Sequence, residues 1–160
     1  MAANRANIGW YIDNQIGGED DRFTGRIYEK IITLTTAQVK AMNSAPIELV
    51  AAPGVGKVIE FVSAVLFLDH DGGSNYATGG NMVVRTSPAA AQVTLSATLT
   101  SAASINLGHD NYAVMQALST AVVLLAADAD EVIELYCSAD HITGTSPMKI
   151  KVTYRIHDFN

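Results

Sequence analysis

The alternation of apolar and polar residues along this chain predicts several β-strands. Residues 148–156 show it most clearly, because Met, Ile, Val, Tyr and Ile alternate with Lys, Lys, Thr and Arg. Residues 82–85 and 92–99 have the same period of two, which is typical of a strand with one buried face. Residues 27–34 and 57–68 are rich in Ile, Val, Phe and Tyr. The run 57–68 lacks a clean alternation, so we expect a central strand that is covered on both faces.

One short helix is predicted near residues 35–43. Thr35 can act as its N-cap by accepting from the backbone N–H of Gln38, and the Gln38 side chain can reach back to complete a capping box. Asn43 is expected to end the helix in a left-handed conformation. A short strand over residues 47–50 follows, so the helix is only about two turns long.

The remaining pattern favours an all-β fold. Residues 112–127 fit both a helical stripe and a strand, whereas residues 132–138 fit a strand alone. Pro53 and Gly54 mark a corner, and the turn-forming sequences DGG, TSP, DAD and TGTSP separate the predicted strands. Several short strands with turns between them predict one antiparallel β-sandwich or barrel.

The first 26 residues differ in kind from residues 27–160, which hold every predicted strand. They combine Asn, Gly and an acidic cluster at 19–21 with apolar and aromatic residues, too polar for a core and too aromatic for a solvated tail. The segment either covers its own sandwich or extends as an arm to a neighbouring subunit. The contact residues of such an arm would be Trp10, Tyr11, Ile12, Ile16 and Phe23.

Composition and charge argue against some classes of binding partner and favour others. A chain of 160 residues is one domain by the usual prior. Its net charge of -6 argues against a nucleic-acid partner, which requires a basic surface. The charged fraction is 16%, against about 25% in a typical soluble domain, so much of the surface is expected to be neutral. Such a surface suits extensive protein contact, although an ordinary β protein with a Ser- and Thr-rich exterior would share it.

Neither a membrane span nor a secretory signal is expected. The longest uninterrupted apolar run covers residues 121–127, far short of the ~18 residues that a spanning helix needs. Arg5 lies near the N-terminus, but no apolar core follows it. Both observations fit a protein that stays in the cytoplasm until it is assembled.

Candidate sites for cofactors and metals are incomplete. The sequence GVGKV at 54–58 departs from a Walker A motif, because Ala51 stands where the motif needs Gly and Val58 where it needs Ser or Thr. The loop Asp69–Asn75 is rich in oxygen ligands, but Gly80 stands where an EF-hand has its bidentate Glu. A turn is therefore expected there, with weak calcium binding as the alternative, and no cofactor is predicted.

No catalytic residue is predicted either. The four histidines, at 70, 109, 141 and 157, show no metal-binding spacing, and sequence-adjacent Asp residues would point to opposite faces of a strand. No serine lies in a G-x-S-x-G elbow. The single Cys137 lies in an apolar run, so it is expected to be a buried, inert thiol.

Two segments carry a resemblance to a known family. The first is LTTAQVKAMNSAPIELVAAPGVGKVI at 34–59, which leads into a long strand, and the second is GTSPMKIKVTYR at 144–155. In this order they resemble a family of small virion proteins of tailed bacteriophages, of the head decoration (cement) or head–tail accessory type. The resemblance covers most of residues 31–156, favours a strand in the ambiguous region, and implies a jelly-roll topology.

The resemblance implies a non-enzymatic role on the capsid surface. The expected partner is the major-capsid lattice, and a homotrimer would match the three-fold positions between capsomers. One alternative is a tail or head-fibre adaptor. Another is a carbohydrate-binding module for the host surface, with Trp10, Tyr76 and Tyr112 as stacking candidates.

Overall fold

The computed structural model describes residues 26–77, 79–87, 92–120, 122 and 129–159. The fold is all-β, with two short helices in the described part of the chain. The elements are β1 (Ile27–Leu34), α2 (Thr36–Lys40), β2 (Ile47–Val50), β3 (Lys57–Leu68), β4 (Met82–Thr86), α3 (Ser101–Ser104), β5 (Asn111–Gln116), β6 (Ile133–Cys137) and β7 (Met148–Asp158).

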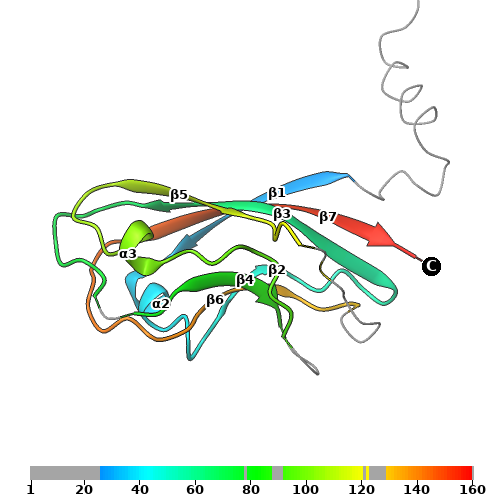
Figure 1. Cartoon of the computed structure of the whole chain (residues 1–160), viewed down its shortest axis with the longest axis horizontal. Coiled ribbons are helices and arrows are strands. Elements are labelled where there is room, and N and C mark those ends of the chain that lie inside the picture. Colours follow the sequence, from blue (N-terminus) through cyan, green and yellow to red (C-terminus); the bar gives the residue numbers. More distant parts are fainter. Residues whose placement is uncertain (1–25, 78, 88–91, 121, 123–128, 160) are drawn as a thin grey trace, which may run out of the picture.

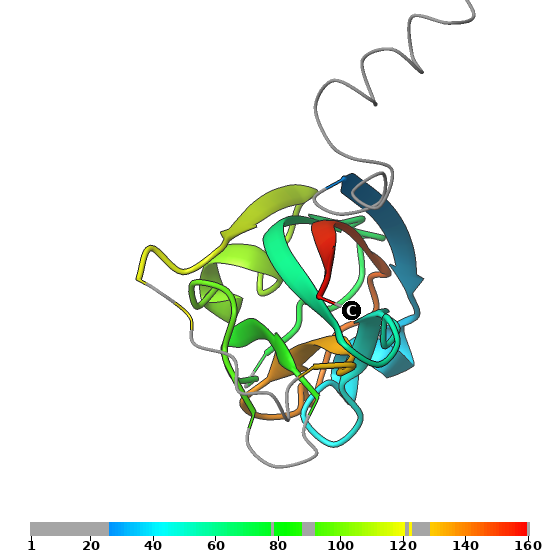
Figure 2. The same cartoon turned by 90° about the vertical axis from the view of Figure 1, so that its right-hand side faces the viewer.

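The strands form two antiparallel sheets that face each other (Figures 1 and 2). The first sheet has the order β1-β7-β3-β5 and the second the order β2-β6-β4. Residues 92–99 run beside β4 through two isolated bridges, Met82 with Leu99 and Arg85 with Thr94. With this segment as an irregular eighth strand, the order is that of a jelly roll. The predicted sandwich is confirmed, and the barrel alternative is wrong because the described sheets do not close on each other.

The core lies between the sheets and is organised around β3 and β7. These strands pair along their whole length, from Lys57 opposite Asp158 to Leu68 opposite Met148. The predicted alternation of β7 is confirmed, since Met148, Ile150 and Val152 are fully buried. Their burial removes apolar side chains from water, which stabilises the fold by roughly 1.5–3 kcal/mol for each large side chain.

The helix start matches the prediction, but its end does not. The Thr35 hydroxyl accepts from the backbone N–H of Gln38, and the Gln38 side chain accepts from the backbone N–H of Thr35 at 2.9 Å. The prediction of a left-handed Asn43 is wrong, because Asp130 is the one described non-glycine residue with positive φ. Asn43 instead donates its backbone N–H to Asp140 Oδ1 (2.8 Å), so a tertiary contact replaces the local terminator.

Two further stretches differ from the expectation from sequence, and a third was ambiguous between helix and strand. β3 is buried on one face only, and a bulge between Phe61 and Ser63 interrupts its alternation, which explains why the sequence resembled a strand covered on both faces. Residues 92–99 are not a regular strand, because they bridge β4 and also, through Ser96 and Ala117, the end of β5. Residues 111–116 form a strand, whereas residues 121 and 123–127 of the ambiguous region lie outside the described residues.

Two glycines of the family-like segments occupy positions that need glycine. Gly54 has a φ of 104° and donates its N–H to Asp130 Oδ1 at 2.6 Å, which forms the corner before β3. Gly144 has a φ of 115°, and a Cβ there would lie 2.2 Å from the Tyr76 ring. Both segments therefore depend on backbone conformations that side chains disfavour.

Candidate interaction surface

The outer face of the first sheet, which points away from the second sheet, presents a mixed apolar and basic surface. The strand register aligns its side chains in rows across the four strands. One row runs from Thr33 through Lys149 and Phe67 to Tyr112. The next runs, in the same strand order, through Ile31, Lys151, Val65 and Val114. From β5 to β1, the face therefore has apolar residues on β5 and β3, lysines on β7, and Ile31 beside polar residues on β1.

Four residues form an apolar corner where β3 meets β5: the half-buried Val65 and Phe67 and the exposed Tyr112 and Val114. The rings of Phe67 and Tyr112 stack with their centroids 4.6 Å apart. Tyr112 remains 70% exposed and Val114 58% exposed, so the described part of the chain leaves this apolar corner open. Stacked aromatics that stay exposed are typical of a contact surface, because their burial by a partner removes a large apolar area from water.

Charged groups continue the outer face along β7. The Lys149 ammonium lies 5.9 Å from the Phe67 ring centroid, at the border of the apolar corner. Lys151 pairs with Glu29 of β1 at 2.8 Å. Farther along, Glu60 accepts from His157 at 2.8 Å and from Arg155 at 3.3 Å. The hydrogen bond from His157 and the contacts with Arg155 hold the pKa of Glu60 below its usual range, although burial acts in the opposite direction.

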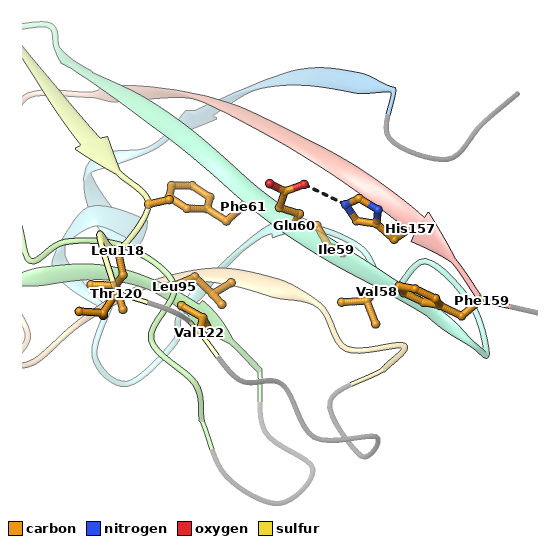
Figure 3. Close-up of a pocket in the computed structure, with 11 residues that line it drawn as sticks. Val58, Ile59, Glu60, Phe61, Leu95, Leu118, Thr120, Val122, His157 and Phe159 are labelled. Atoms are coloured by element: carbon orange, nitrogen blue, oxygen red, sulfur yellow. Dashed lines mark hydrogen bonds and ion pairs between the residues drawn. The ribbon is translucent and has the colours of Figure 1, made fainter. Parts of the chain in front are cut away.

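A groove of about 400 Å³ opens at the end of the sandwich where β3 begins and β7 ends (Figure 3). Its walls are mostly apolar, and the Glu60–His157 pair supplies polar groups among them. Val122, another lining residue, is flanked by positions outside the described residues. The residues that line it are Val58, Ile59, Glu60, Phe61, Leu95, Ala117, Leu118, Thr120, Val122, His157 and Phe159.

The three candidates for carbohydrate stacking have different positions in the structure. Tyr76 is 1% exposed and donates its hydroxyl to the backbone carbonyl of Ser146, so it cannot stack on a bound sugar and that prediction is wrong. Tyr112 is exposed on the outer face. Trp10 lies outside the described residues, as do the other predicted arm contacts, Tyr11, Ile12, Ile16 and Phe23.

Sequence reasoning missed the partners of Tyr112 in the apolar corner. Val65 and Phe67 lie more than forty positions earlier in the chain, and the bulge in β3 hides the alternation that would assign them to one face. The signal that could have found them is the pairing of β3 with β5, which the order of residues alone does not supply. Tertiary pairing therefore creates this corner.

The oxygen-rich loop after β3 is held by internal hydrogen bonds. Asp71 Oδ1 accepts from the Gly73 backbone (2.9 Å), the Thr145 hydroxyl (2.8 Å) and the Ser146 hydroxyl (3.2 Å). These bonds, that from Gly73 first, hold the pKa of Asp71 below its usual value. No group of three or more His, Cys, Asp or Glu side chains suited to a metal occurs among the described residues.

Chelation is expected to leave the fold intact, because protein donors already occupy the Asp71 oxygen that faces the loop. Thermal unfolding with and without EDTA should give melting temperatures within about one degree of each other. A fall of several degrees that calcium reverses would contradict this expectation.

Cys137, the last residue of β6, and His141 form a buried pair beside the core. Cys137 is fully buried, and its Sγ lies 3.5 Å from His141 Nε2. Burial raises the pKa of the Cys137 thiol, as expected for an unreactive cysteine. Burial also lowers the pKa of His141, against the opposing charge of Asp140. The arrangement stabilises the neutral forms of both groups.

Acidification is therefore expected to destabilise the fold through His141. Its pKa in the folded protein lies below the ordinary histidine value of 6.5, so the unfolded chain takes up a proton first as the pH falls past that value. The lowered carboxylate pKa values of Glu60, Asp71 and Asp140 act at lower pH. Urea midpoints at about pH 7.5 and about pH 5.5 should differ more for the natural chain than for His141→Gln. Equal differences would show that His141 does not contribute.

The Walker-like lysine has a structural position. Lys57 begins β3, not a helix, and its ammonium pairs with Asp158 at 3.1 Å.

One serine contacts a histidine. Ser146 Oγ lies 3.3 Å from His70 Nδ1, but Ser146 is buried and its hydroxyl also donates to Asp71. Among the described residues, no helix has the length and apolar character that crossing a membrane requires.

The chain has a likeness to known proteins among solved structures. No protein-family model matches the chain, and no curated protein matches it. Among solved structures, it is similar to a chain of the cyanophage Pam1 capsid asymmetric unit, with 14% sequence identity and a TM-score of 0.47. The match covers 83% of this chain and 86% of the other.

Proposed function

We propose that this protein is a non-enzymatic structural protein of a bacteriophage virion. Within that class, we propose a capsid decoration (cement) protein that braces neighbouring major-capsid subunits. A protein that binds only the assembled lattice stabilises it by mass action. The expected location is the capsid surface, after a stay in the host cytoplasm.

The observation that carries this proposal is how the two family-like segments pack. The first contains α2, β2 and the start of β3, and the second contains most of β7. β3 and β7 are neighbours in the first sheet, and the Thr36 hydroxyl donates to the carbonyl of Thr145 at 2.6 Å. Segments about a hundred residues apart in the chain thus form one contiguous unit. A shared unit of this kind supports the resemblance, because unrelated short matches would not be expected to lie together.

The experiment that tests the proposal is the copy number of the protein in purified particles. Quantification on gels against the major capsid protein should give hundreds of copies per particle for a lattice decoration. A handful of copies would favour the tail or head-fibre adaptor, and complete absence would contradict a virion role. Glycan binding that Tyr112→Ala abolishes would favour the carbohydrate-binding alternative, since Tyr112 is its one described exposed candidate.

The purified chain is expected to be a homo-oligomer, and we propose a trimer. The low charged fraction leaves neutral surface for self-association, and linked subunits would gain avidity on a lattice of matching symmetry. Size-exclusion chromatography with light scattering should give about three times the mass of one chain. A monomer at high micromolar concentration would contradict the trimer in solution.

A further inference from the structure

The outer face of the first sheet leaves the apolar corner open among the described residues, with Tyr112 70% and Val114 58% exposed. We propose that it binds residues 8–23 of a neighbouring copy of this chain, an assignment that rests on the proposed function and its N-terminal arm. The face then becomes one half of a contact between subunits, and the arm becomes the other half.

Apolar and charged groups follow one another in the same order along the arm and across the face. Across the face, the apolar corner of β3 and β5 is followed by Lys149 and Lys151 on β7 and then by Ile31 on β1, where Glu29 already pairs with Lys151 at 2.8 Å. Along the arm, the apolar residues Ile8, Trp10, Tyr11, Ile12 and Ile16, which Asp13, Asn14 and Gln15 interrupt, are followed by the acidic cluster 19–21 and then by Arg22 and Phe23. The zones therefore pair as apolar with apolar, acidic with basic and apolar with apolar.

The spacing also matches. Neighbouring strands lie about 4.8 Å apart, so the path from β5 to β1 is about 14 Å. Ile16 and Phe23 are seven residues apart and can span up to ~23 Å when extended. Ile16 can therefore lie on the apolar corner while Phe23 lies on β1 and the acidic cluster lies over β7. The segment from Ile8 to Tyr11 then extends beyond the corner with the single tryptophan, Trp10.

The direction of β1 favours a neighbouring copy over the same chain. β1 begins at the end of the sheet where Ile27 pairs with Arg155, and the apolar corner lies at the opposite end, beside Leu68 and Met148 (Figure 1). From Ile27 to the row of Thr33 the strand covers about 20 Å. The arm would have to reverse and retrace this length to reach its own corner. In a ring, each arm instead binds the next subunit, which is a head-to-tail contact, and three copies would form the proposed trimer.

Matched substitutions in the full chain test both halves of the contact. The face variant is Tyr112→Lys with Val114→Lys, and the arm variant is Trp10→Ser with Ile16→Ser. The control is Ile142→Lys, which makes the same kind of change at a residue that is 75% exposed outside the sheets. We expect the face and arm variants to associate at least about tenfold more weakly than the natural chain, and the control to be unchanged.

Mixing the variants distinguishes a neighbouring copy from the same chain. A tagged face variant retains its arm, and an untagged arm variant retains its face, so together they should form a complex that the tag captures. Two differently tagged face variants should not capture each other. Failure of the first mixture, when each variant folds by circular dichroism, would overturn the proposal in favour of an arm that covers its own sheet.

A charge reversal tests the face without removing apolar residues. Lys149→Glu should weaken association, and Asp20→Lys with Asp21→Lys in the same chain should restore it, since every copy supplies both halves of the contact. Failure of this rescue would contradict the register. A full chain that is monomeric at high micromolar concentration would overturn the proposal, whatever its copy number in particles. Absence from particles would contradict the proposed function alone.

Discussion

Deletion of residues 1–22 is expected to preserve the β-rich circular dichroism spectrum and solubility of the protein while weakening its incorporation into particles. Residues 27–159 contain every described strand and both family-like segments, so the sandwich has its own core. The arm would supply aromatic contacts to a neighbouring subunit. Sedimentation of particles after incubation with the truncated and the full chain would measure the loss.

Trp10→Ala is expected to reproduce part of that loss. One buried aromatic anchor contributes about 2 kcal/mol or more to an interface, which corresponds to a roughly 30-fold weaker association. Ile142→Ala is the control, because Ile142 is a large apolar residue that is 75% exposed outside the sheets. If the truncated chain unfolds or aggregates, the segment belongs to the core. If it decorates particles as well as the full chain, the sandwich alone makes the contact.

Glu134→Ala is expected to destabilise the fold by about 3–5 kcal/mol, because it leaves a buried guanidinium without its carboxylate. Arg85 Nε donates to Glu134 Oε1 at 2.7 Å, and the two side chains are 9% and 10% exposed. The guanidinium also lies 3.5 Å from the Tyr136 ring centroid and donates to the Gln92 side chain. Such a loss is a large share of the roughly 5–15 kcal/mol that stabilises a typical domain.

Urea unfolding of three proteins would measure this effect. Glu29→Ala is the matched control, because it removes the 2.8 Å pair with Lys151 at a site where both side chains are about half exposed. That change should cost no more than about 1 kcal/mol. The double variant Arg85→Met with Glu134→Leu should recover much of the loss, since it removes both charges. Similar midpoints for Glu134→Ala and Glu29→Ala would contradict the expectation.

Elements with strong local patterns could be predicted from the sequence. β1 and β3 begin and end at the predicted residues, and the capping box of α2 needs only Thr35 and Gln38. β7 repeats a period of two over its predicted length because its inward side chains meet one continuous core. These features depend on residues close together in the chain, so the order of residues is enough to specify them.

Other features required the folded chain. Residues 92–99 alternate like a strand, yet the segment divides its backbone hydrogen bonds between β4 and the end of β5. Tyr76 lies in a loop rich in polar residues, but it is buried against Gly144, nearly seventy positions later. Neither outcome has a local cause, because each depends on which distant segment lies opposite.

The same distinction between local and tertiary causes applies to the candidate interaction surface. The sequence by itself determined the composition of the arm, the low charge and the strands that could form two sheets. Only the tertiary structure decided that Phe67 stacks on Tyr112 and that Arg85 meets Glu134, 49 positions away. Strand propensity and turns act over a few residues, whereas strand order and register follow from how all apolar faces are buried together. A surface composed of four strands therefore exists only once the sheets have formed.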